Sequence, residues 1–242
     1  MDPAIEMIKE LVEEASRLVA FTGAGMSAES GIPTYRGAGG LWSKYDPSKY
    51  ADIRFFLKDP TYYWSFFRDE RYPMLSKARP NAAHIALSKL EQRNKLEVTI
   101  TQNIDGLHQE AGQRNVIELH GNTRTISCMT CGKRTSWDEI FHSLEERFPP
   151  VCSCGGALRP DTVMFGESLP FQAIEHAIRA SQECDAFLVL GSSLVVYPAA
   201  DLPRQAKRNH AKLIIVNMDP TPLDSIADVV YHGKTSDALD WV

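Results

Sequence analysis

Several features are missing from this 242-residue chain, and each absence excludes a class of protein. The longest uninterrupted apolar run, at residues 186–190, is far shorter than the ~20 residues that a membrane-spanning helix needs. Asp and Glu (31) outnumber Lys and Arg (26), so the chain lacks the basic field that attracts nucleic-acid backbones. Its acidic start has no continuous apolar core and is unlike an export signal. We therefore expect no membrane span, no direct nucleic-acid binding and a cytoplasmic location.

Cysteine is scarce, and four of the five cysteines are clustered. Cys128 and Cys131 are separated by two residues, and Cys152 and Cys154 by one. In a chain without an export signal this clustering favours a metal over disulfides. Four thiolates suit a structural zinc ion, with no coordination position left for substrate. The close spacing of the second pair leaves the identity of the fourth ligand open, and His142 is the other candidate. A redox-active cysteine pair is the alternative interpretation of the cluster.

Apolar segments alternate with helical patterns along most of the chain, as in proteins with a parallel sheet. Strands are predicted at residues 18–21, 96–101, 116–119, 186–190, 213–216 and 228–231. Helices are predicted at residues 2–17, 81–92, 170–181 and 199–208. Two of the strands are continuous apolar runs, which is typical of strands covered on both faces. The sequence therefore predicts an α/β fold with a Rossmann-like, doubly wound parallel sheet.

Two segments interrupt this alternation. Residues 31–72 are rich in glycine, proline and aromatics, and residues 121–160 carry the cysteine cluster. We interpret them as insertions that build a small domain against the sheet, with a ligand cleft between the two domains. The predicted large domain comprises residues 1–34, 73–120 and 161–242, and the small domain residues 35–72 and 121–160.

A glycine-rich segment, GAGMSA at residues 23–28, directly follows the first predicted strand. It fits the pattern G-x-G-x-x-G/A, in which one glycine permits a tight turn and the next lets a diphosphate approach the backbone. A dehydrogenase would also need a second strand ending in an acid about 20 residues later, and none follows here. The pattern favours dinucleotide binding without hydride transfer. A purely structural strand-to-helix turn is the alternative.

Four predicted strands end in polar residues, at the edge of a parallel sheet where ligands bind. His120 at one of these ends is suited to accept a proton near neutral pH. Arg36, in a glycine-flanked loop, is suited to pair with a diphosphate. A packed histidine, a solvated arginine and a helix cap at 102–105 are the structural alternatives. The polar residues after the strands are Gln102, Asn103, Asp105, His120, Ser192, Ser193 and Asn217.

Taken in order, these motifs resemble those of the sirtuins, the NAD-dependent protein lysine deacylases. The matching segments are 23–37 (GAGMSAESGIPTYRG), 101–108 (TQNIDGLH), 118–121 (ELHG), the four cysteines, 165–167 (FGE) and 191–198 (GSSLVVYP). The resemblance runs from about residue 21 to the end and is closest to compact bacterial or archaeal members. It implies an NAD-binding large domain, a small zinc-binding and helical domain, and removal of acetyl or longer neutral acyl groups from protein lysines.

The resemblance further implies that NAD is consumed as a co-substrate, with Asn103 and His120 as catalytic residues. Asn103, Asp105 and Ile32 would hold nicotinamide, and Gln102 would contact its ribose. As nicotinamide leaves, the acyl-lysine oxygen would attack C1′; His120 would then act as general base on the ribose hydroxyls, giving 2′-O-acyl-ADP-ribose. The implied NAD contacts are Gly23, Ala24, Gly25, Ser27, Glu29, Ile32, Pro33, Thr34, Tyr35, Arg36, Trp42, Gln102, Asn103, Ile104, Asp105, His120, Gly191, Ser192, Ser193, Asn217 and Thr235.

The implied partner is an acetylated-lysine protein or peptide, bound as an added β-strand. Nicotinamide is the implied product inhibitor, and Cys128, Cys131, Cys152 and Cys154 the implied zinc ligands. The alternative functions are transfer of ADP-ribose to protein, removal of succinyl or malonyl groups from lysine, and a non-catalytic NAD sensor. The implied substrate contacts are Val163, Phe165, Gly166, Glu167, Ser193, Leu194 and Val195.

The chain departs from the family pattern near the nicotinamide pocket and in the helix that would line the acyl pocket. Tyr35 replaces the usual phenylalanine of the first motif. Members that prefer succinyl- or malonyl-lysine carry Tyr-x-x-Arg in a helix that lines the acyl pocket. Alignment on Trp64 places Phe67 and Glu70 at those two positions, so we expect no cationic partner for an acidic acyl group. Nearby arginines, Arg68 and Arg71, leave the register of this helix open.

Overall fold

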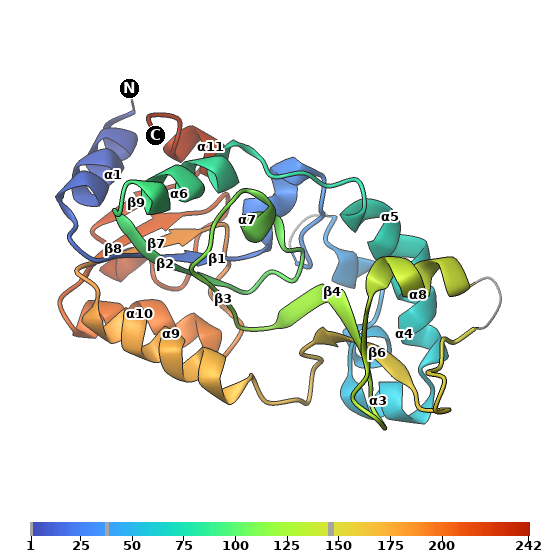
Figure 1. Ribbon diagram of the computed structural model, residues 1–242. Coiled ribbons are helices and arrows are strands. Elements are labelled where there is room, and N and C mark those ends of the chain that lie inside the picture. Colours follow the sequence, from blue (N-terminus) through green and yellow to red (C-terminus); the bar gives the residue numbers. More distant parts are fainter. Residues whose placement is uncertain (1, 37–38, 145–147) are drawn as a thin grey trace.

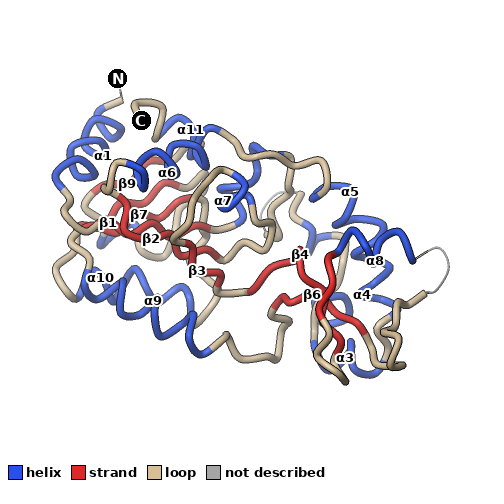
Figure 2. Tube along the Cα trace, viewed as in Figure 1, coloured by secondary structure: helices blue, strands red, loops and turns tan. Residues whose placement is uncertain are grey.

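A six-stranded parallel sheet forms the centre of the computed structural model, which describes residues 2–36, 39–144 and 148–242, except the side chains of His142 and Ser143. The strand order is β3-β2-β1-β7-β8-β9 (Figure 2). This order confirms the predicted doubly wound sheet. The strands are β1 (Leu18–Thr22), β2 (Leu96–Thr101), β3 (Val116–Glu118), β7 (Ala186–Leu190), β8 (Lys212–Val216) and β9 (Val229–Tyr231).

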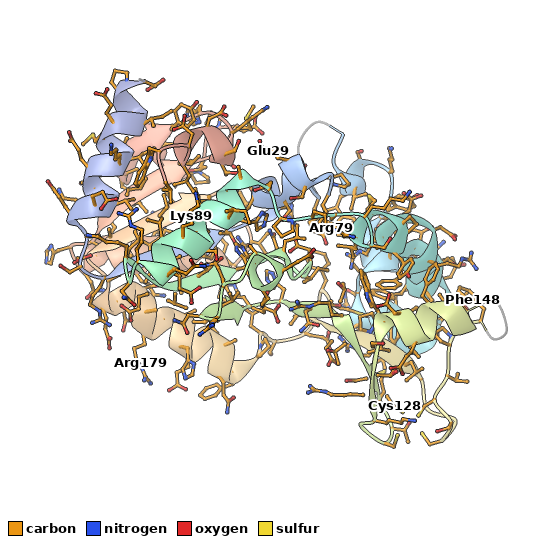
Figure 3. The ribbon with its side chains drawn as sticks, turned by 45° about the horizontal axis from the view of Figure 1, so that its top comes forward. Glu29, Arg79, Lys89, Cys128, Phe148 and Arg179 are labelled. Carbon is orange, nitrogen blue, oxygen red and sulfur yellow. The ribbon has the colours of Figure 1, made fainter. Side chains whose placement is uncertain are left out.

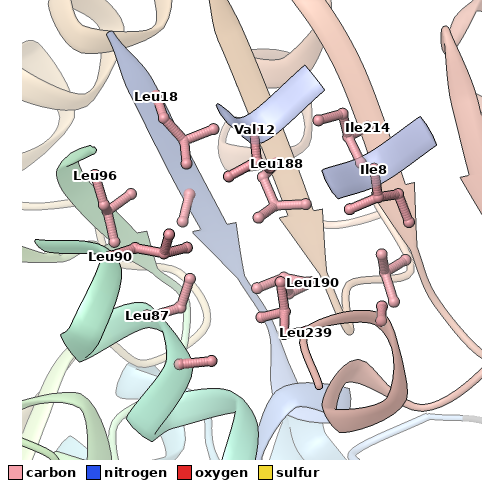
Figure 4. Close-up of a cluster of buried hydrophobic side chains, with 14 of the residues drawn as sticks. Ile8, Val12, Leu18, Leu87, Leu90, Leu96, Leu188, Leu190, Ile214 and Leu239 are labelled. Carbon is pink, nitrogen blue, oxygen red and sulfur yellow. The ribbon is translucent and has the colours of Figure 1, made fainter. Parts of the chain in front are cut away.

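Helices cover both faces of this sheet (Figure 1). Helices α1 (Pro3–Glu14), α6 (Ala82–Gln92) and α11 (Thr235–Ala238) lie on one face, and α9 (Phe171–Glu183) and α10 (Leu202–Arg208) on the other. Alternate side chains of β7 therefore enter two separate cores: Leu188 packs with α1 and α6 (Figure 4), and Phe187 with α9 and α10. Within the described residues, no helix has both the length and the apolar character to cross a membrane.

A smaller region lies beside the carboxyl edge of the sheet (Figure 1). Its antiparallel sheet has the order β5-β4-β6, and its apolar cluster is separate from the two cores of the large sheet. Trp64 is fully buried in this cluster and donates from Nε1 to the carbonyl of Leu158 at 3.0 Å. The elements are β4 (Gly121–Cys128), β5 (Arg134–Ser136), β6 (Leu158–Thr162), α2 (Pro47–Tyr50), α3 (Ile53–Lys58), α4 (Thr61–Phe66), α5 (Tyr72–Leu75) and α8 (Trp137–Ser143). This separate core is evidence for two domains. The residue boundaries of the domains stay a prediction.

Two segments differ from the sequence-based expectation. The first helix ends at Glu14 rather than at residue 17, because the carboxylate of Asp185 accepts hydrogen bonds from the backbone N–H groups of Ser16 and Arg17. The segment that contains the first glycine motif forms a 3-10 helix, η1 (Ala24–Ser30), where no helix was predicted. A short helix, α7 (Leu107–Glu110), follows the polar end of β2.

Candidate active site

A cleft of about 1110 Å³ lies between the carboxyl edge of the large sheet and the smaller region. The predicted polar strand ends meet there: Gln102, Asn103, His120, Ser192 and Asn217 all line it. Trp42, Ala51 and Tyr63 of the predicted small domain line the same cleft, together with the segment 162–167. The cleft therefore brings together residues from both of the predicted domains.

Glycines after β1 and β7 allow two loops to cross at close range. Gly25 donates from its backbone nitrogen to the carbonyl of Gly191 at 2.8 Å. A Cβ on Gly191 would lie 2.2 Å from the nitrogen of Met26, and its φ of 63° also favours glycine. Both glycines line the cleft, so the loops present backbone there without side chains in the way. This is the geometry that a diphosphate requires.

Asn103 is fixed by hydrogen bonds at the end of β2. Its Nδ2 donates to the carbonyl of Gly23 at 3.0 Å and to Oγ of Ser27 at 3.1 Å, and its backbone nitrogen donates to Thr101. Ser27 in turn donates to Asp105 at 2.8 Å. Ser27 is buried and does not line the cleft, so it supports the neighbouring Asn103. Asn103 keeps its Oδ1 acceptor outside these contacts.

His120 lies at the junction between the large sheet and β4. Its Nδ1 is 2.9 Å from the carbonyl of Gln102, which can only accept, so Nδ1 carries the proton and Nε2 holds the lone pair. Burial lowers the pKa of His120, and the hydrogen bond to Gln102 opposes that shift only in part. The imidazole is therefore neutral at pH 7 and equipped to accept a proton through Nε2.

The family resemblance implies that Ser192, Ser193 and Asn217 hold the adenosine half of NAD, and all three line the cleft. Gln102 donates to Oγ of Ser192 at 2.8 Å, which links the ends of β2 and β7. Glu29 accepts from the hydroxyl of Ser236 at 2.6 Å, which places it beside α11 (Figure 3). The buried Oγ1 of Thr235 has no partner among the described residues. Polar groups thus continue to the end of the cleft.

A loop after η1 covers the middle of the cleft. The backbone nitrogens of Leu41 and Trp42 donate to the carbonyls of Thr34 and Tyr35 at 2.9 and 3.0 Å, which folds the loop back on itself. Arg36 also lines the cleft. A second, smaller cavity of about 30 Å³ adjoins it, with room for about one or two waters. Its lining includes the predicted nicotinamide contacts Ile32, Asn103 and Asp105. It also includes four other predicted NAD contacts: Ala24, Pro33, Tyr35 and Ile104.

The segment predicted to bind the peptide is tied to elements on either side. Phe165 exchanges backbone hydrogen bonds with Ala51 and Ile53, at 2.8 and 3.0 Å. Val163 donates to the carbonyl of His120 at 2.9 Å. Glu167 pairs with Arg159 at 2.7 Å, while Phe165 remains 41% exposed in the cleft. These contacts hold the segment against the proposed base.

Two predicted substrate contacts lie outside the lining of the cleft. Leu194 is buried among the side chains that α9 and α10 cover, and has a φ of 54°. Val195 is exposed but does not line the cleft. Their neighbours Ser193 and Val196 do line it. Only the main chain at Leu194 could therefore take part in binding a peptide.

The four clustered cysteines have the geometry of a metal site. Their sulfur atoms all lie within 4.8 Å of one another, and the closest pairs, Cys128–Cys154 and Cys131–Cys152, are 3.5 and 3.7 Å apart. Tetrahedral zinc with bonds of about 2.3 Å requires sulfur atoms about 3.8 Å apart. All four thiols are free, so the short second pair is compatible with zinc. The side chain of His142, the reserve ligand, lies outside the described part of the structure.

The cleft residues that sequence analysis did not assign to the site include Tyr63 and Arg71. Both are buried and both line the cleft, and Arg71 also lines the smaller cavity. Arg71 follows Glu70 in a π-helical turn, η3 (Phe67–Arg71), which holds one more residue per hydrogen-bonded turn than an α-helix. Glu70 instead hydrogen-bonds Tyr45, whose pKa it raises to about 12. Arg71 therefore places a cation on the cleft lining, one residue beyond the aligned Glu70, and the expected preference for neutral acyl groups stays a prediction.

Comparisons with known proteins agree with this architecture. The model of the Sir2 family matches residues 23–198. An NAD-dependent protein deacetylase of Sulfurisphaera tokodaii is 47% identical over 98% of this chain and 94% of that protein. The NAD-dependent protein deacylase 2 of Archaeoglobus fulgidus is 45% identical over 99% and 94%. A solved structure described as "Sir2-p53 peptide-NAD+" is 41% identical, with a TM-score of 0.91 over 98% of this chain and 96% of that one. This chain is accordingly a member of the Sir2 family.

Proposed function

We propose that this protein is an NAD-dependent protein lysine deacetylase that also accepts longer neutral acyl groups. The observation that carries the proposal is the state of His120, a neutral imidazole with a protonated Nδ1 at a cleft built around a dinucleotide turn. The relatives named as deacetylase and deacylase, and the related structure with peptide and NAD+, support the same conclusion.

NAD supplies the ribose that takes the acyl group: nicotinamide leaves, the acyl group moves from the lysine nitrogen to the 2′-oxygen, and one water is consumed. His120 accepts the proton of the ribose hydroxyl through Nε2. Asn103, fixed through its Nδ2, orients the nicotinamide end. The glycine loops at Gly25 and Gly191 bind the diphosphate, with Arg36 as its cationic partner.

The peptide would lie against the segment 163–167 as an added strand, with the lysine stem beside Phe165. Released nicotinamide would return to the cavity near Asp105 and inhibit turnover. The four cysteines would hold one zinc ion far from the reacting atoms, in a structural role. Figure 3 places Cys128 in the smaller region, well away from Glu29 at the adenosine end.

The test is mass spectrometry of an acetyl-lysine peptide incubated with the protein, with and without NAD. We expect acetyl loss only with NAD, with one O-acetyl-ADP-ribose formed per lysine released. His120→Tyr should lower the rate at least ~100-fold, the minimum for loss of a general base. His176→Tyr, on the exposed surface of α9, is the matched control and should keep full activity.

Two outcomes would contradict the proposal. Acetyl loss without NAD, or full activity of a folded His120→Tyr variant, would remove the assigned co-substrate or base. ADP-ribose found on the acceptor protein, with the acetyl group retained, would identify a transferase.

A further inference from the structure

The cleft segment at residues 163–167 lies outside the helices and strands of the structure. It turns sharply, because Glu167 donates from its backbone nitrogen to the carbonyl of Met164 at 3.1 Å and Gly166 has a φ of 88°. Its one bridge to another part of the chain joins Phe165 to Asp52. A turn without strand pairing is free to move unless other contacts fix it, so its path depends on the side chains that hold it.

Arg159 of β6 holds this turn at both of its ends. Its Nη1 and Nη2 donate to the two carboxylate oxygens of Glu167, both at 2.7 Å. The same Nη2 donates to the carbonyl of Thr162 at 2.6 Å. Oε2 of Glu167 also accepts from the backbone nitrogen of Met164 at 2.8 Å. One guanidinium therefore joins the start of the turn to its end, and the carboxylate fixes the middle.

The ion pair between Arg159 and Glu167 is partly buried. The two side chains are 15% and 26% exposed. Burial alone would raise the pKa of Glu167, but the hydrogen bonds from Arg159 and from the backbone of Met164 lower it below its usual value. Glu167 is therefore ionised at pH 7, and a bidentate pair between ionised groups fixes the direction of both more firmly than a single exposed contact does.

The contribution of Glu167 to the cleft is its main chain. Both of its carboxylate oxygens already accept hydrogen bonds from within the protein. A peptide bound as an added strand pairs with main-chain N–H and C=O groups, and their direction follows the path of the turn. Loss of the contacts from Arg159 should therefore weaken the binding of the peptide.

The proposed diphosphate site is built by other elements. Gly25 and Gly191 lie in loops that follow β1 and β7 of the large sheet, whereas Arg159 belongs to the small antiparallel sheet and does not line the cleft. A change at Arg159 should therefore leave NAD binding as it is.

Arg159 takes its own position from the sheet that carries the cysteines. It is paired with Ser127 of β4, and its neighbour Leu158 is paired with Cys128. Leu158 also accepts the hydrogen bond from the buried Trp64. The order of this sheet thus reaches the turn at residues 163–167 through one side chain.

We propose that Arg159 is a positioning residue for the peptide: by holding Thr162 and Glu167 it sets the main-chain path of residues 163–167, so that the cysteine-bearing sheet governs the affinity for peptide and not that for NAD. This inference rests on the proposed function, because it assigns to that site the contact that orders its peptide wall. Arg159 takes no part in bond making or breaking.

The test measures initial rates with the acetyl-lysine peptide and NAD varied separately. Arg159→Met should raise the KM for the peptide by about 10-fold, the equivalent of one charge-assisted hydrogen bond, and leave kcat and the KM for NAD unchanged. Arg159→Lys should recover part of the loss, because an ammonium group cannot form the bidentate contact. Arg134→Met is the matched control and should leave both KM values unchanged, since Arg134 also pairs with a carboxylate of β6, Asp161, but is 74% exposed.

Zinc content and calorimetry separate this role from a loss of folding. Arg159→Met and Arg134→Met should each retain as much zinc per chain as the wild type. Glu167→Gln keeps the shape of the side chain and one oxygen acceptor, so it should weaken peptide binding by less than Arg159→Met does.

Several results would overturn the inference. One is an unchanged peptide KM in a folded Arg159→Met variant, and another is a KM for NAD that rises together with that for the peptide. If the wild type turns over no peptide, the proposed function fails, and calorimetry with the acetyl-lysine peptide judges the inference separately. Tighter binding by the wild type than by Arg159→Met would support it, and equal or undetectable binding would reject it.

Discussion

The large sheet and the smaller region are held together by different means. Side chains of β7 and β8 such as Leu188 and Ile215 are fully buried in aliphatic cores that the chain builds alone. The smaller region packs aromatic rings such as Trp64 and Phe67 beside four thiols that need a metal. None of the four cysteines lines the cleft, which both regions form, so we expect catalysis to depend on a metal that does not contact the substrate.

Removing the metal should give the largest difference in stability between the two regions. We expect one zinc per chain by elemental analysis, and Cys152→Ala or a strong chelator should unfold the smaller region. Structural zinc contributes on the order of 10 kcal/mol in small zinc domains. Hydrogen exchange should then show lost protection in β4–β6 with protection retained in β1, β7 and β8. Metal-free protein with full protection throughout would refute the zinc site.

Truncating one buried side chain in each region should destabilise the two regions differently, by less than metal removal does. Leu188→Ala should lower the free energy of unfolding by about 2–5 kcal/mol, and Phe56→Ala by about 3–5 kcal/mol. Hydrogen exchange should rise across the whole chain for Leu188→Ala, but within the smaller region for Phe56→Ala. An identical pattern for the two variants would mean that both regions unfold as one unit.

Lowering the pH should destabilise the large region, because a histidine of α6 is buried there. Burial, together with the charge of His108, lowers the pKa of His84 to about 3. The unfolded chain therefore binds a proton near pH 6.5 that the folded chain does not, so stability falls as pH drops from 6.5 toward 3 and levels off below that. The loss approaches about 1.4 kcal/mol per pH unit.

Urea unfolding at pH 7.5, 6.5 and 5.5 measures this effect, with His84→Gln as the comparison. The wild type should lose about 1 kcal/mol more than the variant between pH 6.5 and 5.5. Parallel pH profiles for the two proteins would show that His84 is protonated equally in both states.

The regular periodicity of the large region is what made it predictable. The strand predicted at residues 96–101 is β2, because apolar residues and the polar end at Gln102 mark both limits. The helix expected to reach residue 17 stops early because Asp185, distant in sequence, captures the backbone of Ser16. Local patterns carry no information about such a partner.

The smaller region was less predictable, since its strands are short and mixed in polarity. Strand β6 contains a proline, Pro160, and β4 alternates only in part, so neither gave a clear signal. The metal site could be predicted from the cysteines, because the spacing of metal ligands is a local sequence pattern. The place of Arg71 on the cleft lining could not be predicted, because counting from Trp64 assumes regular α-helical turns and η3 is a π-helix.

That π-helical turn also bears on how such a protein could change during evolution. One residue corresponds to about 100° of rotation in an α-helix, so deleting a single codon within η3 would turn Arg71 away from the cleft and bring a neighbour of different charge toward it. The side chains that this segment presents to the cleft can therefore be changed by a one-residue insertion or deletion, without any amino acid being exchanged. Column-by-column comparison of relatives would then pair side chains that occupy different places in the cleft.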